Sequence, residues 1–135
     1  MTMVTGPDIA GAANVRTAAS TFAWVTFGSV TVASSSEGLQ SAAITIAGGT
    51  VAVTASDDGI NATSHTTQGG AEQVEEGVSL TVTGGTLTVA AGSDGIDSNG
   101  TASITGGTVA VAAQGGGGGN GALDVNGTLT APAVL

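Results

Sequence analysis

A short sequence pattern recurs along this chain with a nearly constant period, and internal repetition restricts the possible folds more than any other feature. Residues 49–53 read Gly-Thr-Val-Ala-Val, and related segments stand at residues 85–89, 107–111 and, in degenerate form, 28–32. The offsets between their first glycines are 21, 36 and 22 residues. The larger offset equals one period plus an insertion, which we place near residues 61–76.

Within each repeat, apolar and polar residues alternate over three to five positions, and Val, Thr and Ile dominate. This alternation predicts short β-strands. Three short strands in a period of 21–22 residues are typical of one coil of a parallel β-helix. We therefore expect an all-β, right-handed parallel β-helix, a solenoid of about four coils, over residues 21–135. Residues 1–20 do not fit the repeat, so we expect an irregular segment there: a cap, a linker or a vector-derived piece.

If coils stack directly on one another, equivalent apolar residues form columns that fill the interior. The alignment predicts three such columns: Val30, Val51, Leu87 and Val109; Val32, Val53, Val89 and Val111; and Leu39, Ile60, Ile96 and Leu123. Aromatic residues make up only 2% of the chain, and these aliphatic columns do not need them. Paired glycines such as Gly48-Gly49 are expected at sharp turns with positive φ.

The chain carries a formal net charge of −9 and a single Lys or Arg, Arg16. Nucleic acid is therefore excluded as a partner, because phosphate binding requires basic side chains. No stretch approaches the length of a membrane-spanning helix, so we expect no membrane insertion. The absence of Cys excludes disulfides and thiolate metal sites. We expect no enzyme activity, because no basic side chain lies within the repeats to support β-helix lyase or hydrolase chemistry.

Acidic residues recur at equivalent positions of successive repeats. Glu37, Asp58 and Asp94 align with one another, and Gln40, Asn61, Asp97 and Asp124 form a second aligned set. Carboxylates stacked about 4.8 Å apart repel each other unless a cation neutralises them. Oxygen ligands without His or Cys suit Ca²⁺. We therefore predict a calcium site from these residues: Glu37, Asp57, Asp58, Asn61, Asp94, Asp97, Asn99 and Asp124. The alternative is that the Asp-Gly pairs only form turns.

A few residues outside the aligned acidic sets are weaker candidates for a role in binding. Trp24 and Asn120 are candidate sugar-contacting residues, although Trp24 suits a core or end-cap role as well. Glu75 and Glu76 close the insertion and are either further calcium ligands or solvated charges. His65 has no neighbouring His or Cys, so we expect a solvated loop residue.

Four segments together resemble a bacterial family of carbohydrate-binding β-helix proteins that bind cellulose and pectin. They are residues 56–62 (Ser-Asp-Asp-Gly-Ile-Asn-Ala), 95–100 (Gly-Ile-Asp-Ser-Asn-Gly), 104–109 (Ile-Thr-Gly-Gly-Thr-Val) and 120–124 (Asn-Gly-Ala-Leu-Asp). The resemblance covers about residues 28 to 130. It implies a pectate-lyase-like fold, bound calcium, no catalysis, and an extracellular or cell-surface location. The chain differs from the family at residues 124–127, Asp-Val-Asn-Gly, where members usually read Asp-Tyr-Asp-Gly.

From this resemblance and the acidic repeats we expect calcium-dependent binding of an acidic plant cell-wall polysaccharide, polygalacturonate or pectin, with cellulose as a further ligand. The calcium ions would bridge protein carboxylates to uronate carboxylates, which explains how an acidic chain holds a polyanion. The alternative is a structural subunit whose open ends associate end to end into extracellular filaments.

Overall fold

The computed structural model describes residues 2–4, 8–11, 15–16, 22–64, 73–114 and 121–132. The regular elements in these residues are all β-strands, so the described protein is all-β. No helix in this part of the chain is long and apolar enough to cross a membrane.

The strands form three parallel sheets, here named A, B and C. Sheet A contains, in order, β1 (Thr2–Val4), β4 (Phe22–Val25), β7 (Ala43–Ile46), β10 (Ser79–Val82), β13 (Thr101–Ile104) and β16 (Leu129–Thr130). Sheet B contains β2 (Asp8–Gly11), β5 (Ser29–Ser35), β8 (Thr50–Ala55), β11 (Thr86–Ala91) and β14 (Thr108–Ala113). Sheet C contains β3 (Val15–Arg16), β6 (Leu39–Ser41), β9 (Ile60–Ala62), β12 (Ile96–Ser98) and β15 (Leu123–Val125).

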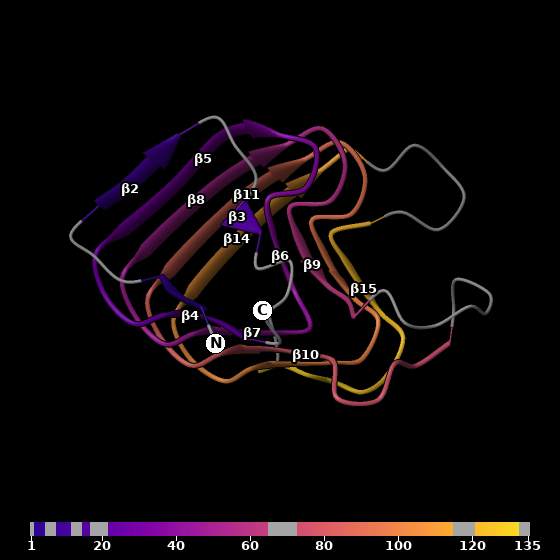
Figure 1. Cartoon of the computed structure of the whole chain (residues 1–135). Helices are drawn as coiled ribbons and strands as arrows, with labels where there is room; N and C mark the ends of the chain where they lie inside the picture. The colour runs from indigo at the N-terminus through magenta and orange to yellow at the C-terminus, as the bar shows by residue number, and fades with distance from the viewer. Residues whose placement is uncertain are drawn as a thin grey trace.

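The chain visits the sheets in the fixed order A, B, C and then returns to A. We call each such trio of strands a coil. Every strand pairs in parallel with the strand three places earlier or later in the sequence, and Figure 1 shows the sheets arranged around a common interior. This arrangement is compatible with a parallel β-helix.

The register of the strands confirms the predicted apolar columns. Val30 pairs with Val51, Val51 with Leu87, and Leu87 with Val109. Leu39, Ile60, Ile96 and Leu123 follow one another in the same way in sheet C. Ile60 and Ile96 are fully buried. The strand alternation therefore sends one apolar row of each sheet into a shared aliphatic core.

Glycines permit two kinds of close approach in this stack. Gly49, Gly85 and Gly107, the second members of the predicted glycine pairs, adopt φ near +80° at the turn from sheet A to sheet B. Gly59 occupies another corner without a positive φ. A Cβ there would collide with a methyl group of Val89 and with the carbonyl oxygen of Gly95, so the packing of the next coil requires glycine.

The N-terminal segment differs from the irregular piece that we expected. Strands β1, β2 and β3 pair in parallel with β4, β5 and β6, and so add a coil to the four expected after residue 20. Ladder pairing uses backbone groups only, so these strands need no copy of the Gly-Thr-Val motif. Ile9 pairs with Val30 and Val15 with Leu39, which keeps apolar residues in register. A domain boundary at residue 20 stays a prediction.

Candidate functional site: an acidic face beside sheet C

The corner that leads from sheet B into sheet C carries the first set of aligned acids. Backbone hydrogen bonds of 3.0 Å run from Gly38 N to Asp58 O and from Gly59 N to Asp94 O, so Glu37, Asp58 and Asp94 lie above one another. The Asp58 carboxylate accepts the backbone N–H of Asp94 at 3.0 Å, and the Asp94 carboxylate accepts that of Gly121 at 2.6 Å. Part of their role is therefore structural, as the turn-forming alternative predicts.

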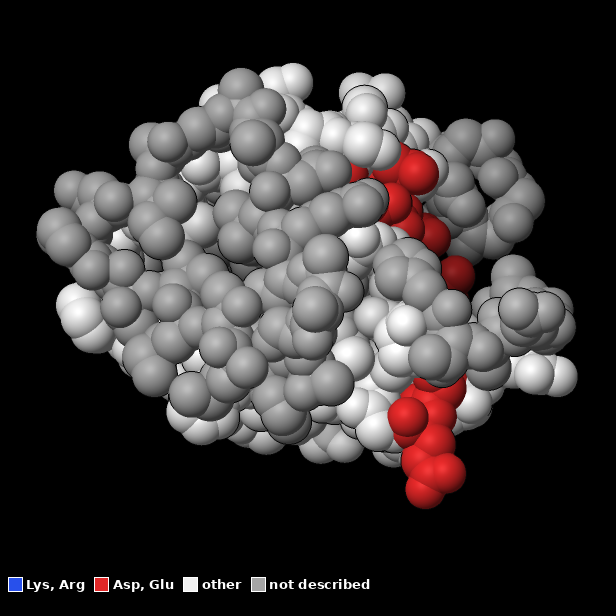
Figure 2. Space-filling view, viewed as in Figure 1, with Lys and Arg blue, Asp and Glu red and all other residues white. Residues whose placement is uncertain are grey.

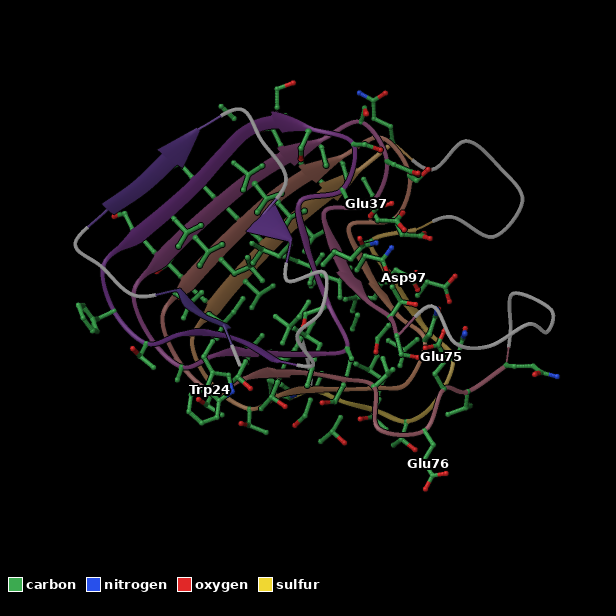
Figure 3. All side chains as sticks on the ribbon, in the orientation of Figure 1. Trp24, Glu37, Glu75, Glu76 and Asp97 are labelled. Atoms are coloured by element: carbon green, nitrogen blue, oxygen red, sulfur yellow. The ribbon has the colours of Figure 1, made fainter. Side chains whose placement is uncertain are left out.

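The second set of aligned side chains belongs to sheet C itself. Gln40 pairs with Asn61, Asn61 with Asp97, and Asp97 with Asp124. The two sets meet, because Asn61 Nδ2 donates a hydrogen bond of 3.1 Å to Glu37 Oε2. In Figure 2 the visible acidic atoms form two groups, one at the upper right and one at the lower edge. Figure 3 places Glu37 and Asp97 on the right, beside sheet C, and Glu76 at the lower edge.

We call the combined surface the acidic face. Its members are Glu37, Asp57, Asp58, Asn61, Asp94, Asp97 and Asp124. Seven of the eight predicted calcium ligands thus belong to this surface. The eighth, Asn99, instead donates hydrogen bonds to Glu75 and Thr63.

Two carboxylates of the acidic face, those of Asp97 and Asp58, have raised pKa values. Partial burial, followed by repulsion from Asp58, Asp124, Asp94 and Glu37, raises the pKa of Asp97 from the ordinary value of 3.8 to about 7. Burial and the neighbouring acids Glu37, Asp57 and Asp94 raise the pKa of Asp58 to about 6, although its hydrogen bond from the Asp94 backbone acts in the opposite direction. The members of the acidic face include no basic residue, so none of these described side chains neutralises the repulsion.

Asn61 also has a buried side-chain oxygen without a hydrogen-bond partner, which a cation could contact. Its side chain is 8% exposed, and its Oδ1 atom is buried without a hydrogen-bond donor. A buried carbonyl oxygen without a partner costs about 1–3 kcal/mol. Oδ1 is an oxygen ligand of the kind that Ca²⁺ takes, and it lies on the same side chain that contacts Glu37. In the described residues, however, no three His, Cys, Asp or Glu side chains are already arranged around a single metal position.

The raised pKa values predict how pH affects the metal-free protein. A folded-state pKa above the unfolded value means that the folded chain binds protons more tightly, so stability falls as pH rises. For Asp58 and Asp97 this window runs from 3.8 to about 7. We expect thermal unfolding in chelator to show a lower midpoint at neutral pH than at about pH 5. An equal or higher midpoint at neutral pH would contradict the raised pKa values of Asp58 and Asp97.

Asn99 belongs to a different cluster, centred on Glu75. The Glu75 carboxylate is 4% exposed and accepts hydrogen bonds from Asn99 Nδ2 at 2.9 Å, Thr63 Oγ1 at 3.2 Å and the Ser64 backbone N–H at 2.7 Å. The Ser64 hydroxyl donates to it as well. These donors compensate the buried charge, so Glu75 joins the two ends of the insertion to the neighbouring coil. Of the two alternatives for Glu75, the solvated charge is therefore wrong, whereas the adjacent Glu76 is exposed.

Glu75→Ala should destabilise the protein through this cluster. The substitution leaves buried donors of Thr63, Ser64 and Asn99 without their acceptor, at a cost of about 1–3 kcal/mol. Glu76→Ala removes an equal charge from the next, exposed residue and should change stability by less than about 0.5 kcal/mol. Urea unfolding of both variants measures the difference, and equal effects would show that the cluster contributes nothing.

The two candidate sugar-contacting residues are not part of the acidic face. Trp24 lies on β4 in sheet A with 38% of its surface exposed, and Figure 3 shows it at a distance from Asp97. It is therefore not a fully buried core residue. Asn120 lies outside the described residues, as does His65.

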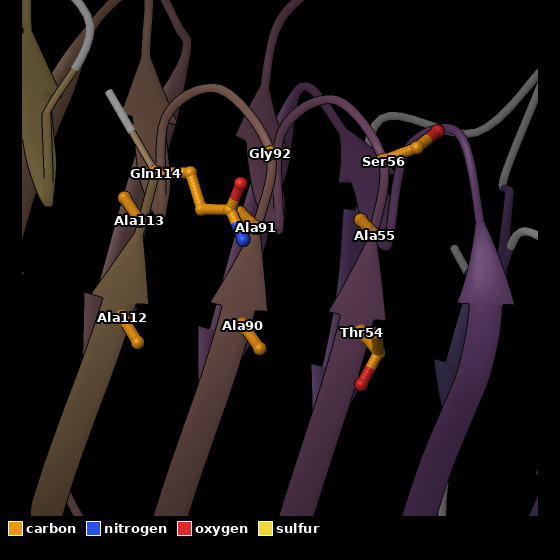
Figure 4. Close-up of a pocket in the computed structure, with 9 residues that line it drawn as sticks. All are labelled: Thr54, Ala55, Ser56, Ala90, Ala91, Gly92, Ala112, Ala113 and Gln114. Carbon is orange, nitrogen blue, oxygen red and sulfur yellow. The ribbon is translucent and has the colours of Figure 1, made fainter. Parts of the chain in front are cut away.

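A groove adjoins the acidic face at the end of sheet B. It has a volume of about 430 Å³ and is lined by Thr54, Ala55, Ser56, Ala90, Ala91, Gly92, Ala112, Ala113 and Gln114 (Figure 4). Ser56 directly precedes Asp57, and Gly92 lies two residues before Asp94. Small side chains thus leave room beside the corners that carry the first set of acids.

Comparison with known proteins agrees with a role in sugar recognition. A family model described as a carbohydrate-binding domain-containing protein matches residues 5–121, which is most of the chain. No curated protein and no solved structure gives a significant match. The matched range includes most of the acidic face and three complete coils of the stack, β4–β6, β7–β9 and β10–β12. The chain belongs to the family of carbohydrate-binding domain-containing proteins.

Proposed function

We propose that this protein is a non-catalytic, calcium-dependent module that binds an acidic polysaccharide, polygalacturonate or pectin, at the acidic face. The observation that carries the proposal is the concentration of oxygen ligands around Asp97, whose pKa is raised to about 7 by partial burial and by four neighbouring carboxylates. Such a surface repels a polyanion by itself, so acidic sugar binding requires a cation between the two partners.

The residues of the acidic face fit calcium better than other biological metals. They offer carboxylate and amide oxygens, and neither His nor Cys is among them. Glu37, Asp58 and Asp97 would hold the ion, and the orphaned Asn61 Oδ1 would gain the positive partner that it lacks. Calcium, when bound, supplies positive charge that both protein and uronate carboxylates share. Because three acidic side chains do not already converge on one position, carbonyl oxygens are expected to complete the ligand set.

The proposed fold is a right-handed parallel β-helix. The right hand follows from the general preference for right-handed connections between parallel strands of the same sheet. Successive coils bring residues from positions 37 to 124 into one surface, which a polymer with repeated charges can contact at several points. Binding of a cell-wall polymer further suggests an extracellular or cell-surface location.

Retention of the protein on immobilised polygalacturonate tests the proposal. We expect retention in calcium, release in chelator, and weak retention on fully methyl-esterified pectin, which has the same backbone without the charges. Equal retention in calcium and in chelator would refute calcium dependence. Formation of unsaturated or reducing-end products from polygalacturonate would refute the non-catalytic role.

A further inference from the structure

The outermost strands at the two ends of the stack have no partner strand among the described residues. In the described residues, β1, β2 and β3 end the three sheets on one side, whereas β16, β14 and β15 end them on the other. Each edge presents backbone N–H and C=O groups that a parallel strand can pair with, and exposed edges of this kind favour association.

The last coil also leaves the apolar columns uncovered. Ile96 is fully buried, but Leu123, which follows it in the same column, is 41% exposed. In the columns of sheet B, Leu87 and Val89 are 1% exposed, whereas Val109 and Val111 are only partly buried. Within the described residues, the C-terminal end of the stack is therefore an apolar surface bordered by β16, β14 and β15.

A partner for this end must offer three parallel strands with the same spacing around an apolar interior. The first coil of a second copy meets that requirement, because its pairing with β5 and β6 shows that β2 and β3 follow the parallel register of the stack, and their other edges face away from it. In sheet A the short strand β16 occupies the equivalent layer. It makes two register pairs with β13, compared with three between β1 and β4, so β16 is expected to give way to the incoming β1.

Charge complementarity favours the same partner. Arg16 is the only Lys or Arg in the chain, and it pairs in register with Gln40 at the start of the polar row of sheet C. The row continues through Asn61 and Asp97 and ends at Asp124. In a head-to-tail pair that preserves this register, Arg16 of one copy takes the position next to Asp124 of the other.

We propose that copies of this chain stack head to tail, with β2 and β3 of one copy extending the sheets that end in β14 and β15 of the next. The contact is heterologous, so it leaves an open end on each side and permits assemblies larger than dimers. Because β16 must first leave β13, we expect association to depend on protein concentration. The proposal is independent of calcium and sugar binding.

Cysteine cross-linking tests the register directly, since the native chain has no Cys. Arg16→Cys combined with Asp124→Cys places two thiols about 4.8 Å apart between copies, within disulfide reach. Within one chain they lie four layers apart, about 19 Å, so every disulfide must be intermolecular. The matched control combines Asp8→Cys, on sheet B, with Asp124→Cys.

We expect oxidation of the Arg16/Asp124 pair to give dimers and longer covalent ladders at least tenfold faster than the control pair. Equal rates would overturn the proposed register. Sedimentation velocity in chelator and without polysaccharide provides the second readout. Wild-type protein should gain mass with concentration, Arg16→Asp should lose this association, and Arg16→Asp combined with Asp124→Arg should regain it.

A wild-type chain that stays monomeric at every concentration would overturn the proposal. The same would follow if Arg16→Asp and the double charge reversal associated equally. Leu123→Lys, which places a charge on the uncovered column, should also abolish association, whereas Val74→Lys at a comparably exposed apolar position should not. Polygalacturonate retention of the same variants is measured separately, so loss of sugar binding is not confused with loss of stacking.

Discussion

Asp97→Asn is expected to stabilise the metal-free protein and to weaken its calcium binding at the same time. Four carboxylates repel Asp97, and this repulsion contributes to raising its pKa to about 7, so a neutral amide of similar size relieves part of that repulsion at neutral pH. The same substitution removes a proposed calcium ligand. Removing a residue that only hydrogen-bonds to a metal ligand lowers metal affinity about 10- to 100-fold. Because Asp97 is itself a proposed ligand, we expect at least that decrease in calcium affinity.

Two thermal unfolding experiments measure these opposite effects. In chelator, the midpoint of Asp97→Asn should exceed that of the wild type; in excess calcium, the order should reverse, because only the wild type gains the full stabilisation from bound ligand. Glu76→Gln provides the control, since it removes one negative charge at an exposed position outside the acidic face. A variant less stable than the wild type in chelator would show that Asp97 is not under electrostatic repulsion.

Ile96→Ala should cause a large loss of stability. Ile96 is fully buried between Ile60 and Leu123 in the apolar column of sheet C, and its truncation leaves a cavity that neighbouring coils fill only partly. Such substitutions cost about 2–5 kcal/mol. Leu123→Ala removes a similar side chain from the same column, but Leu123 is 41% exposed, and we expect about 1 kcal/mol.

Urea unfolding of the two variants compares a buried and an end position of one column. The result expected is a clearly larger decrease for Ile96→Ala. Equal decreases would mean that Leu123 is covered in solution, which is also what head-to-tail stacking predicts at high protein concentration. The comparison is therefore made at low concentration, where equal losses would contradict the burial of the column.

The repeat alignment predicted the columns of the core because each apolar position recurs at a nearly fixed period. Val51, Leu87 and Val109 share a motif that can be aligned without a structure, and their register follows that alignment. The acidic face was predictable for the same reason. Once Asn61 and Asp97 occupy equivalent positions, stacking alone places them next to each other.

Other features carried no periodic signal. Strands β1 to β3 pair through the backbone, and their sequences share no motif with later repeats, so only the structure assigns them to the sheets. Glu75 lies in the insertion, where alignment gives no equivalent residue, and its burial depends on contacts with Thr63 and Asn99. Asn99 lies two residues after Asp97 in sequence, but its side chain belongs to this cluster, where Glu75 offers it an acceptor. Whether the acidic face binds calcium stays a prediction.

A calorimetric titration with calcium, repeated in the presence of polygalacturonate, tests the central proposal most directly. We predict saturable calcium binding to the protein alone and tighter calcium binding when polygalacturonate is present. If calcium raises the affinity for polygalacturonate, polygalacturonate must raise the affinity for calcium by the same factor. Absence of saturable binding heat, or a calcium affinity that polygalacturonate leaves unchanged, would contradict a cation shared between the acidic face and the sugar.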